Sequence, residues 1–267
     1  MFRHFLLVFY GPEILFNLGL WFNLSPMLLH LLWPLLFFWN TVGSAKAPAL
    51  TGQDVIAKMH RKYAGKFDPY FTFDQTAVLY KSPQDSTVQV WHEAIVFPGK
   101  LVIKFDDFSA GNGAIYAQDS QFVFKDNVLQ SRRRRVHELL VLAFDVYHQP
   151  VARTVAQLQE AGIDLSLARQ TSWQDKNVYV VGNPEGSHFI IDQKKLWLLQ
   201  TVRQTGENRT VVDLKGYQKL QDNWIATNLT FSLNGRRTMR EVYYNMKFPN
   251  ALPADIFTVA GFNAARW

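Results

Sequence analysis

The sequence predicts a mainly β protein of the α+β class, in which a single strongly curved antiparallel sheet forms an incomplete barrel. Apolar and polar residues alternate with a period of two in about eleven short segments, which is typical of antiparallel strands. Short turns rich in Gly, Pro, Asn and Asp separate these segments. Only two regions have helical spacing, and we expect them to cover the sheet as an N-terminal helix and a mid-chain helical hairpin.

Composition limits the class of protein. The chain has 267 residues, of which 48% are hydrophobic and 15% aromatic, so disordered and collagen-like classes are excluded. It has no cysteine, which excludes disulfides, thiolate metal sites, thiol nucleophiles and a lipid-modified N-terminal Cys. The excess of Lys and Arg over Asp and Glu, 28 against 22, is too small to indicate nucleic-acid binding by itself.

Residues 1–47 differ from the rest of the chain. Their apolar stretch from Met27 to Trp39 is short for a membrane span but suits the core of a signal peptide. Ala45-Lys46-Ala47 follows with the small-x-small pattern of a cleavage site, so we place the cut after Ala47. We therefore expect a signal peptide or an N-terminal hydrophobic anchor over 1–47 and one domain over 48–267.

An amphipathic helix is expected over residues 52–64. Thr51 and Asp54 have the spacing of a capping box, apolar residues then recur at helical intervals, and Gly65 is a suitable stop. Beyond Gly65 the period changes to two. The strands predicted in this half cover 71–80, 87–97, 100–106, 114–118 and 121–125.

The helical period returns over residues 133–163. The first part, which includes Val136 and Tyr147, is apolar on almost every side, so it must be buried or face an apolar ligand. Pro150 marks the start of a second helix and Gly162 its end, which gives a helical hairpin. The strands predicted after this hairpin cover 177–182, 187–192, 195–204, 209–216, 223–233 and 238–248.

No catalytic motif stands out. The nucleophile elbow, the Walker loop and the dinucleotide fingerprint are absent, and the scattered histidines do not have metal-ligand spacing. Glu93 alternates with apolar residues on one strand face. It is therefore a general acid or ligand-binding group with a raised pKa, an inward acid paired with Arg or Lys of an adjacent strand, or an acid at an edge position in solvent. A hydrolase that uses Glu93 with Asp106 or Asp107 is a further alternative, but we expect no enzyme, no metal and no cofactor.

The basic run Arg132-Arg133-Arg134-Arg135 precedes the apolar helix. We expect it to form a solvated turn and helix start, or to bind an anionic head group or an acidic protein partner. Nucleic-acid binding is the weakest alternative, because single-strand binders combine basic residues with exposed aromatic ones.

The order of several segments resembles the LolA/LolB family of bacterial lipoprotein carriers, and in particular the outer-membrane lipoprotein-sorting proteins. The resemblance covers most of residues 51–267. It rests on Val55–Tyr63, Phe73-x-Gln75, Trp91-His92-Glu93-Ala94, Pro98-Gly99-Lys100-Leu101, Glu138–Tyr147, Val178–Gly182, and Tyr243–Lys247 with Phe257.

This resemblance implies a non-enzymatic periplasmic carrier that shelters acyl chains of lipids or lipoproteins in transit to the outer membrane. Its partners would be acyl chains and the sorting proteins of the inner and outer membranes, and we expect a monomer that binds no nucleic acid. The residues expected to line the lipid cavity and its lid are Phe73, Trp91, Ile95, Leu101, Ile103, Phe105, Leu139, Leu140, Leu142, Phe144, Tyr147, Ile225, Leu229 and Phe231.

The sequence also allows two alternatives to a lipid carrier. The same apolar residues could simply fill a closed barrel. The chain could also be an envelope interaction protein, anchored in the inner membrane by residues 5–39, that binds a protein partner through a sheet edge or through Arg132–Arg135.

Overall fold

A computed structural model describes residues 49–267, of which Leu50–Trp267 form one compact unit. The signal peptide or anchor expected over 1–47 lies outside the described residues. Among residues 49–267, no helix has the length and hydrophobicity that crossing a bilayer requires.

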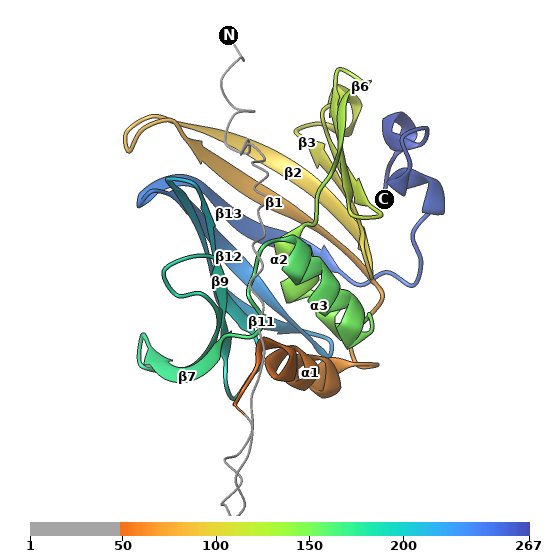
Figure 1. Ribbon diagram of the computed structural model, residues 1–267. Coiled ribbons are helices and arrows are strands. Elements are labelled where there is room, and N and C mark those ends of the chain that lie inside the picture. The colour runs from red at the N-terminus through yellow and green to blue at the C-terminus, as the bar shows by residue number, and fades with distance from the viewer. Residues whose placement is uncertain (1–48) are drawn as a thin grey trace, which may run out of the picture. The chain divides into compact units, whose positions relative to one another are not determined.

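All strands of the unit belong to one sheet of 13 strands, in the order β6-β5-β4-β3-β2-β1-β13-β12-β11-β10-β9-β8-β7, and every pair is antiparallel. Two meanders, β1–β6 and β7–β13, are joined where the first strand pairs with the last (Figure 1). The strands are β1 (Tyr70–Tyr80), β2 (Ser86–Val96), β3 (Lys100–Phe105), β4 (Gly113–Ala117), β5 (Ser120–Lys125), β6 (Val128–Arg134), β7 (Ala168–Trp173), β8 (Lys176–Gly182), β9 (His188–Asp192), β10 (Leu198–Thr205), β11 (Asn208–Leu220), β12 (Asn223–Leu233) and β13 (Arg236–Lys247).

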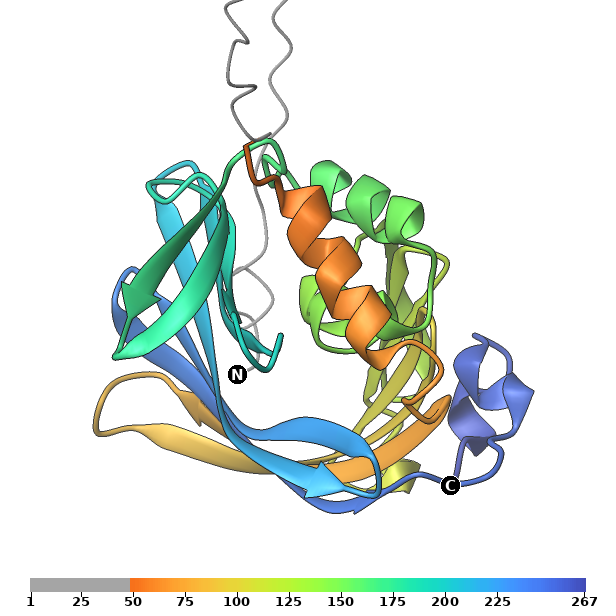
Figure 2. The same cartoon turned by 90° about the horizontal axis from the view of Figure 1, so that it is seen from below.

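The sheet curves strongly but does not close, because β6 and β7 are its two free edges. The chain between these edges forms α2 (Glu138–Ala143), the 3-10 helix η3 (Asp145–Tyr147) and α3 (Val151–Glu160). These helices and α1 (Gly52–Tyr63) lie on the concave side of the sheet (Figure 2). The predicted incomplete barrel, with helices over its concave side, is therefore confirmed.

Helix α1 begins as the sequence predicts. The Thr51 hydroxyl accepts a hydrogen bond from the Asp54 backbone N–H at 3.2 Å, and the Asp54 carboxylate accepts one from the Thr51 backbone N–H at 2.9 Å. This capping box satisfies backbone donors that a helix start leaves unpaired. Val55, Ile56 and Met59 face the sheet and are fully buried.

The mid-chain helices differ from the prediction. The helical region expected from residue 133 begins only at Glu138, and its first helix ends at Ala143 after six residues. The backbone of Phe144 leaves the helical region, with φ −140° and ψ −62°, and a single 3-10 turn follows before α3. The apolar residues recur at helical spacing without a break in the sequence, but the chain bends at Phe144.

Two strands were missed, and they are the two edges of the sheet. Strand β6 carries the basic run, and β7 is rich in polar residues, so neither has the apolar face that predicts a strand. Polar and charged residues are common on edge strands because they discourage pairing with other chains. The expected eleven strands become 13 for this reason.

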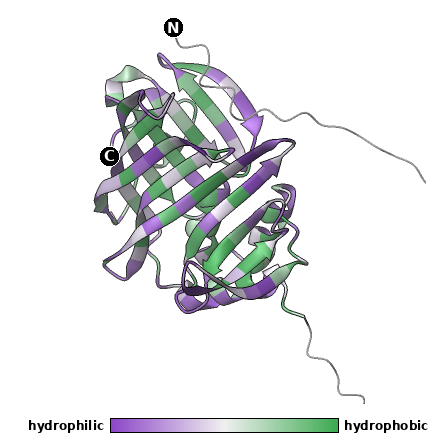
Figure 3. Cartoon of the chain, turned by 90° about the vertical axis from the view of Figure 1, so that its left-hand side faces the viewer, coloured by the Kyte–Doolittle hydropathy of each residue, from purple (hydrophilic) through white to green (hydrophobic). Residues whose placement is uncertain are grey.

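Alternation along the strands separates three apolar cores, of which the smallest is formed by Val178, Val180, Ile190 and Leu199 on β8, β9 and β10. Hydrophobic and hydrophilic residues alternate along many strands (Figure 3). The largest core joins the concave face to the helices. A second core lies on the opposite face of β2–β5, where the C-terminal 3-10 helices η4 (Ala254–Phe257) and η5 (Phe262–Ala264) cover it. Lys104 is fully buried in this region. Its ammonium group donates a hydrogen bond to the Phe262 carbonyl at 2.9 Å and lies over the Phe262 ring.

Gly52 provides a test of how closely α1 packs on the sheet. A Cβ at this position would lie 2.6 Å from the Val181 side chain and 3.0 Å from the Leu165 carbonyl oxygen. We expect Gly52→Ala to lower the free energy of unfolding by about 1–2 kcal/mol, although alanine normally favours a helix. Urea unfolding measures the change, and Gln53→Ala, at an exposed neighbour, is the control that should be nearly neutral. A stabilised Gly52→Ala protein would contradict this packing.

Candidate functional site

The concave face of the sheet brings the predicted lining residues together. All of them belong to the largest apolar core, which is continuous from the sheet to the helices. Those that are buried are Phe73, Ile95, Leu101, Ile103, Leu140, Leu142, Tyr147, Ile225 and Leu229; those that are partly exposed are Trp91, Phe105, Leu139, Phe144 and Phe231.

Aromatic rings hold the mid-chain helices on the sheet. Phe144 stacks on Phe97 of the β2–β3 turn with ring centroids 5.2 Å apart, and Tyr147 stacks on Phe67 at 5.3 Å. Phe67 also contacts Phe97, at 5.9 Å. The segment that contains Phe144 and Tyr147 therefore rests on a cluster of aromatic rings.

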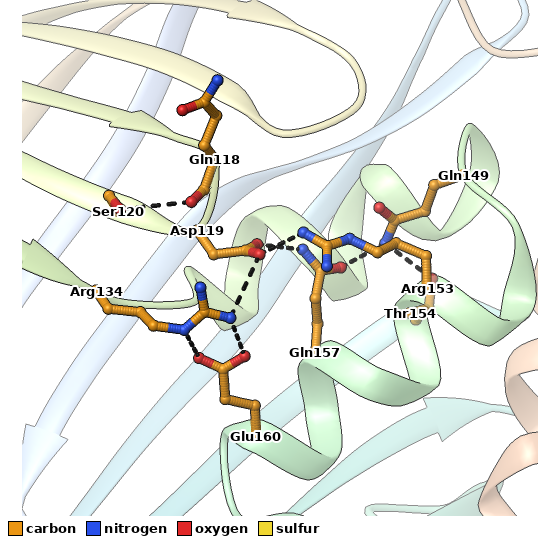
Figure 4. Close-up of polar contacts among 9 residues, drawn as sticks. All are labelled: Gln118, Asp119, Ser120, Arg134, Gln149, Arg153, Thr154, Gln157 and Glu160. Atoms are coloured by element: carbon orange, nitrogen blue, oxygen red, sulfur yellow. Dashed lines mark hydrogen bonds and ion pairs between the residues drawn. The ribbon is translucent and has the colours of Figure 1, made fainter.

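A polar latch fixes α3 to the β4–β5 turn (Figure 4). Asp119 in this turn accepts hydrogen bonds from Arg153 and from Gln157, the latter at 2.7 Å, and lies 3.9 Å from Arg134 of β6. Glu160 at the end of α3 accepts two hydrogen bonds from Arg134, each of 2.6 Å. We call Asp119, Arg134, Arg153, Gln157 and Glu160 the α3 latch.

The buried carboxyl group of Asp145 connects η3 to the β2–β3 turn. Asp145 in η3 accepts a hydrogen bond from the Gly99 N–H at 2.9 Å, and its second oxygen has no partner. Burial raises the pKa of Asp145 to about 7. Tyr116, His137 and Asp145 all line a cavity of about 20 Å³, large enough for one water molecule.

The basic run lies on the edge strand β6 rather than at a helix start, so that expectation was wrong. Residues of a strand alternate between its two faces, and the run divides accordingly. Arg133 and Arg135 donate to the Gln121 side chain, at 2.8 Å and 3.2 Å for the Nε and Nη1 atoms respectively. Arg132 lies over the Phe122 ring and Arg134 belongs to the α3 latch.

Two acids lie on the concave face among the apolar residues. Glu93 of β2 and Glu241 of β13 are 7% and 6% exposed. Burial, together with the charge of Glu241, raises the pKa of Glu93 well above its ordinary value. Burial also raises the pKa of Glu241 to about 7, although the Tyr243 hydroxyl, which donates a hydrogen bond to the Glu241 carboxyl at 3.4 Å, opposes the rise.

The Lys or Arg partner expected for Glu93 is not formed within residues 49–267. Nor does Glu93 meet Asp106 or Asp107: Asp106 is exposed in the turn after β3, and Asp107 caps the 3-10 helix η2 (Phe108–Ala110). Sequence reasoning missed Glu241, although the alternation Met239, Glu241, Tyr243 already places it on a face with aromatic neighbours. In the described part of the chain, no group of three or more His, Asp or Glu could hold a metal ion.

No protein-family model and no curated protein sequence matches the chain. Its structure is similar to that of a DUF1329 family protein from Desulfovibrio piger, with a TM-score of 0.57 and 11% identity over 79% of this chain and 97% of the other. A LolA superfamily protein from Nitrosomonas europaea matches with a TM-score of 0.51 and 13% identity over 79% and 98%. A putative outer membrane lipoprotein-sorting protein domain from Vibrio parahaemolyticus matches with 0.53 and 11% over 78% and 97%.

These likenesses confirm the predicted resemblance at the level of the fold. The chain spans nearly the full length of each of these three proteins. At 11% to 13% identity, what they share with this chain is the open, helix-covered half-barrel.

The buried acids predict how stability depends on pH. A carboxyl whose pKa is raised by folding binds a proton more tightly in the folded state, so the fold loses stability as pH rises from about 4.5 through 7. The loss from Glu241 alone is on the order of 3 kcal/mol. We expect the free energy of unfolding to fall between pH 5 and pH 8, and Glu241→Gln to reduce this fall. Glu185→Gln, at an exposed turn, should leave it unchanged; an identical pH profile for both variants would contradict the burial of Glu241.

The α3 latch predicts a local change in dynamics. Burial favours the protonated form of Asp119, but hydrogen bonds from Gln157 and Arg153 outweigh it and hold its pKa below the usual value. We expect Asp119→Asn to cost about 1 kcal/mol, because Arg134 and Arg153 are half exposed and well solvated. Hydrogen exchange should speed up in α3 and remain unchanged in α1. Asp175→Asn, in an exposed turn, is the control, and equal protection of α3 in both variants would show that Asp119 does not hold the helix.

Proposed function

We propose that this protein is a non-enzymatic carrier that shelters acyl chains of lipids or lipoproteins between its concave sheet face and its helices. The observation that carries the proposal is the continuity of one apolar surface from β1, β2, β3 and β12 to α1 and α2. The likeness to a LolA superfamily protein and to a lipoprotein-sorting domain supports the same role.

Partly exposed residues give this surface a place where a chain can enter. Trp91 and Phe105 lie side by side on β2 and β3, with ring centroids 4.6 Å apart, and Phe231 lies on β12. Burying a methylene group contributes about 0.8 kcal/mol, so ten of them supply on the order of 8 kcal/mol before the cost of association. This gain is of the same order as the cost of association, which is about 4–15 kcal/mol, so each further buried methylene group adds to the affinity.

The helices are suited to act as a lid. The segment between β6 and β7 contributes no strand to the sheet. It can therefore move without breaking the hydrogen bonds between strands. Aromatic contacts and the α3 latch hold it closed, and both can reform after a ligand leaves.

We further propose that the carrier works in the periplasm, after residues 1–47 direct its export and are cleaved. The alternative is an envelope protein that keeps this segment as an inner-membrane anchor and binds a protein partner. Exposed apolar residues on the free edge strand β6, Val128 at 59% and Leu129 at 39%, favour that alternative.

Native and denaturing mass spectra of the protein exported by a Gram-negative host test both statements. We expect a chain that begins at Pro48 and carries bound lipid. A ligand-free chain would contradict the carrier role. An uncleaved N-terminal segment in the membrane fraction would favour the anchored alternative.

Substitutions on the two faces of the sheet separate lipid binding from stability. We expect Phe105→Ser with Phe231→Ser to reduce bound lipid at least fivefold in native mass spectra, because both rings face the proposed chain. The matched control is Val88→Ser with Val90→Ser, which removes two apolar side chains from exposed positions on the other face of β2. Equal lipid content in the two double variants, with equal melting temperatures, would contradict the proposed site.

A further inference from the structure

The concave face contains buried polar side chains that are not required for binding an acyl chain. Gln75 of β1 is fully buried, and neither its side-chain oxygen nor its nitrogen has a hydrogen-bond partner. A buried amide left unpaired costs free energy, so its presence on an otherwise apolar face requires an explanation.

The register of the sheet places this amide between the two acids. Gln75 pairs with Trp91 of β2 on one side and with Tyr243 of β13 on the other. Glu93 follows Trp91 by two residues and Glu241 precedes Tyr243 by two residues. Both side chains therefore lie on the same face as Gln75, on opposite sides of it along β1. All three side chains are buried, so they share the interior between the sheet and the helices.

These groups together form an acceptor site. Two carboxyl groups and the Gln75 carbonyl oxygen can accept hydrogen bonds, and a primary ammonium group has three donors. Phe73 and Tyr243, with ring centroids 4.3 Å apart, border the same site and provide aromatic faces that attract a cation. Among residues 49–267, these two acids are not part of a group of three or more His, Asp or Glu that could hold a metal ion.

We propose that Gln75, Glu93 and Glu241 form a binding site for the primary ammonium group of an amphiphile whose alkyl chain lies on the concave face. The inference rests on the proposed carrier function and adds the chemistry of the head group to it. The ammonium ion satisfies the unpaired amide oxygen and compensates the two buried carboxylates, while the chain extends over the neighbouring apolar residues.

Calorimetry with ligands of one chain length tests the site. We expect dodecylammonium to bind the full chain at least tenfold more tightly than dodecanoate or dodecanol, each used below its micelle concentration. In Glu93→Gln with Glu241→Gln this preference should fall below threefold. The matched control, Glu185→Gln with Glu207→Gln, removes the same charge from exposed turns and should keep the preference.

The outcomes separate the two proposals. Equal affinity of the unsubstituted chain for all three ligands would overturn the ammonium site and leave the carrier function standing. Binding of none of them would overturn both. Because this comparison needs no variant, it decides the inference even if the double substitution prevents folding.

Two ligand pairs then identify the source of the ammonium group. A preference for monoacyl phosphatidylethanolamine over monoacyl phosphatidylcholine would assign it to a phospholipid. A preference for an acylated peptide with a free N-terminus over its N-acetylated form would assign it to a lipoprotein.

Discussion

The pairing of β1 with β13 is the contact on which the rest of the structure depends. It joins two meanders into one sheet of 13 strands and leaves β6 and β7 as free edges. Because β6 and β7 are consecutive strands, the chain between them must cross from one edge of the curved sheet to the other. That crossing segment contains α2, η3 and α3, and it lies on the concave side of the sheet. The lid is a consequence of an open sheet rather than an added part.

The concave face combines two requirements that oppose each other. Its aromatic and aliphatic side chains favour burial, and they form one core with the helices. The same face carries Gln75, Glu93 and Glu241, whose burial is unfavourable, and raised pKa values for both acids are the sign of that cost. A protein selected only for stability would have apolar residues at these positions. A site that recognises the polar end of an amphiphile explains their presence on this face.

Much of this fold could be predicted from periodicity. The capping box at Thr51 and the alternation from Ile225 to Phe231 depend on neighbours in sequence, and both are found as expected. The edge strands escaped prediction because exposure to solvent removes the apolar face on which a strand is recognised. The placement of Glu93 and Glu241 on either side of Gln75 escaped it because the register between distant strands decides which side chains share a region of the sheet. All the apolar residues chosen for the concave face meet in one core, since each could be assigned to a face by its period alone.

The proposed carrier role requires that the concave face admits an alkyl chain beneath the helices. A crystal structure of the protein with a fatty acid brominated at its terminal carbon tests it most directly, because anomalous scattering locates the bromine without reference to weak lipid density. We expect an anomalous peak beside the concave residues of β2, β3 and β12, such as Phe105 and Phe231. A peak confined to the outer face of the sheet, or side chains that fill the concave face with no bromine present, would contradict it.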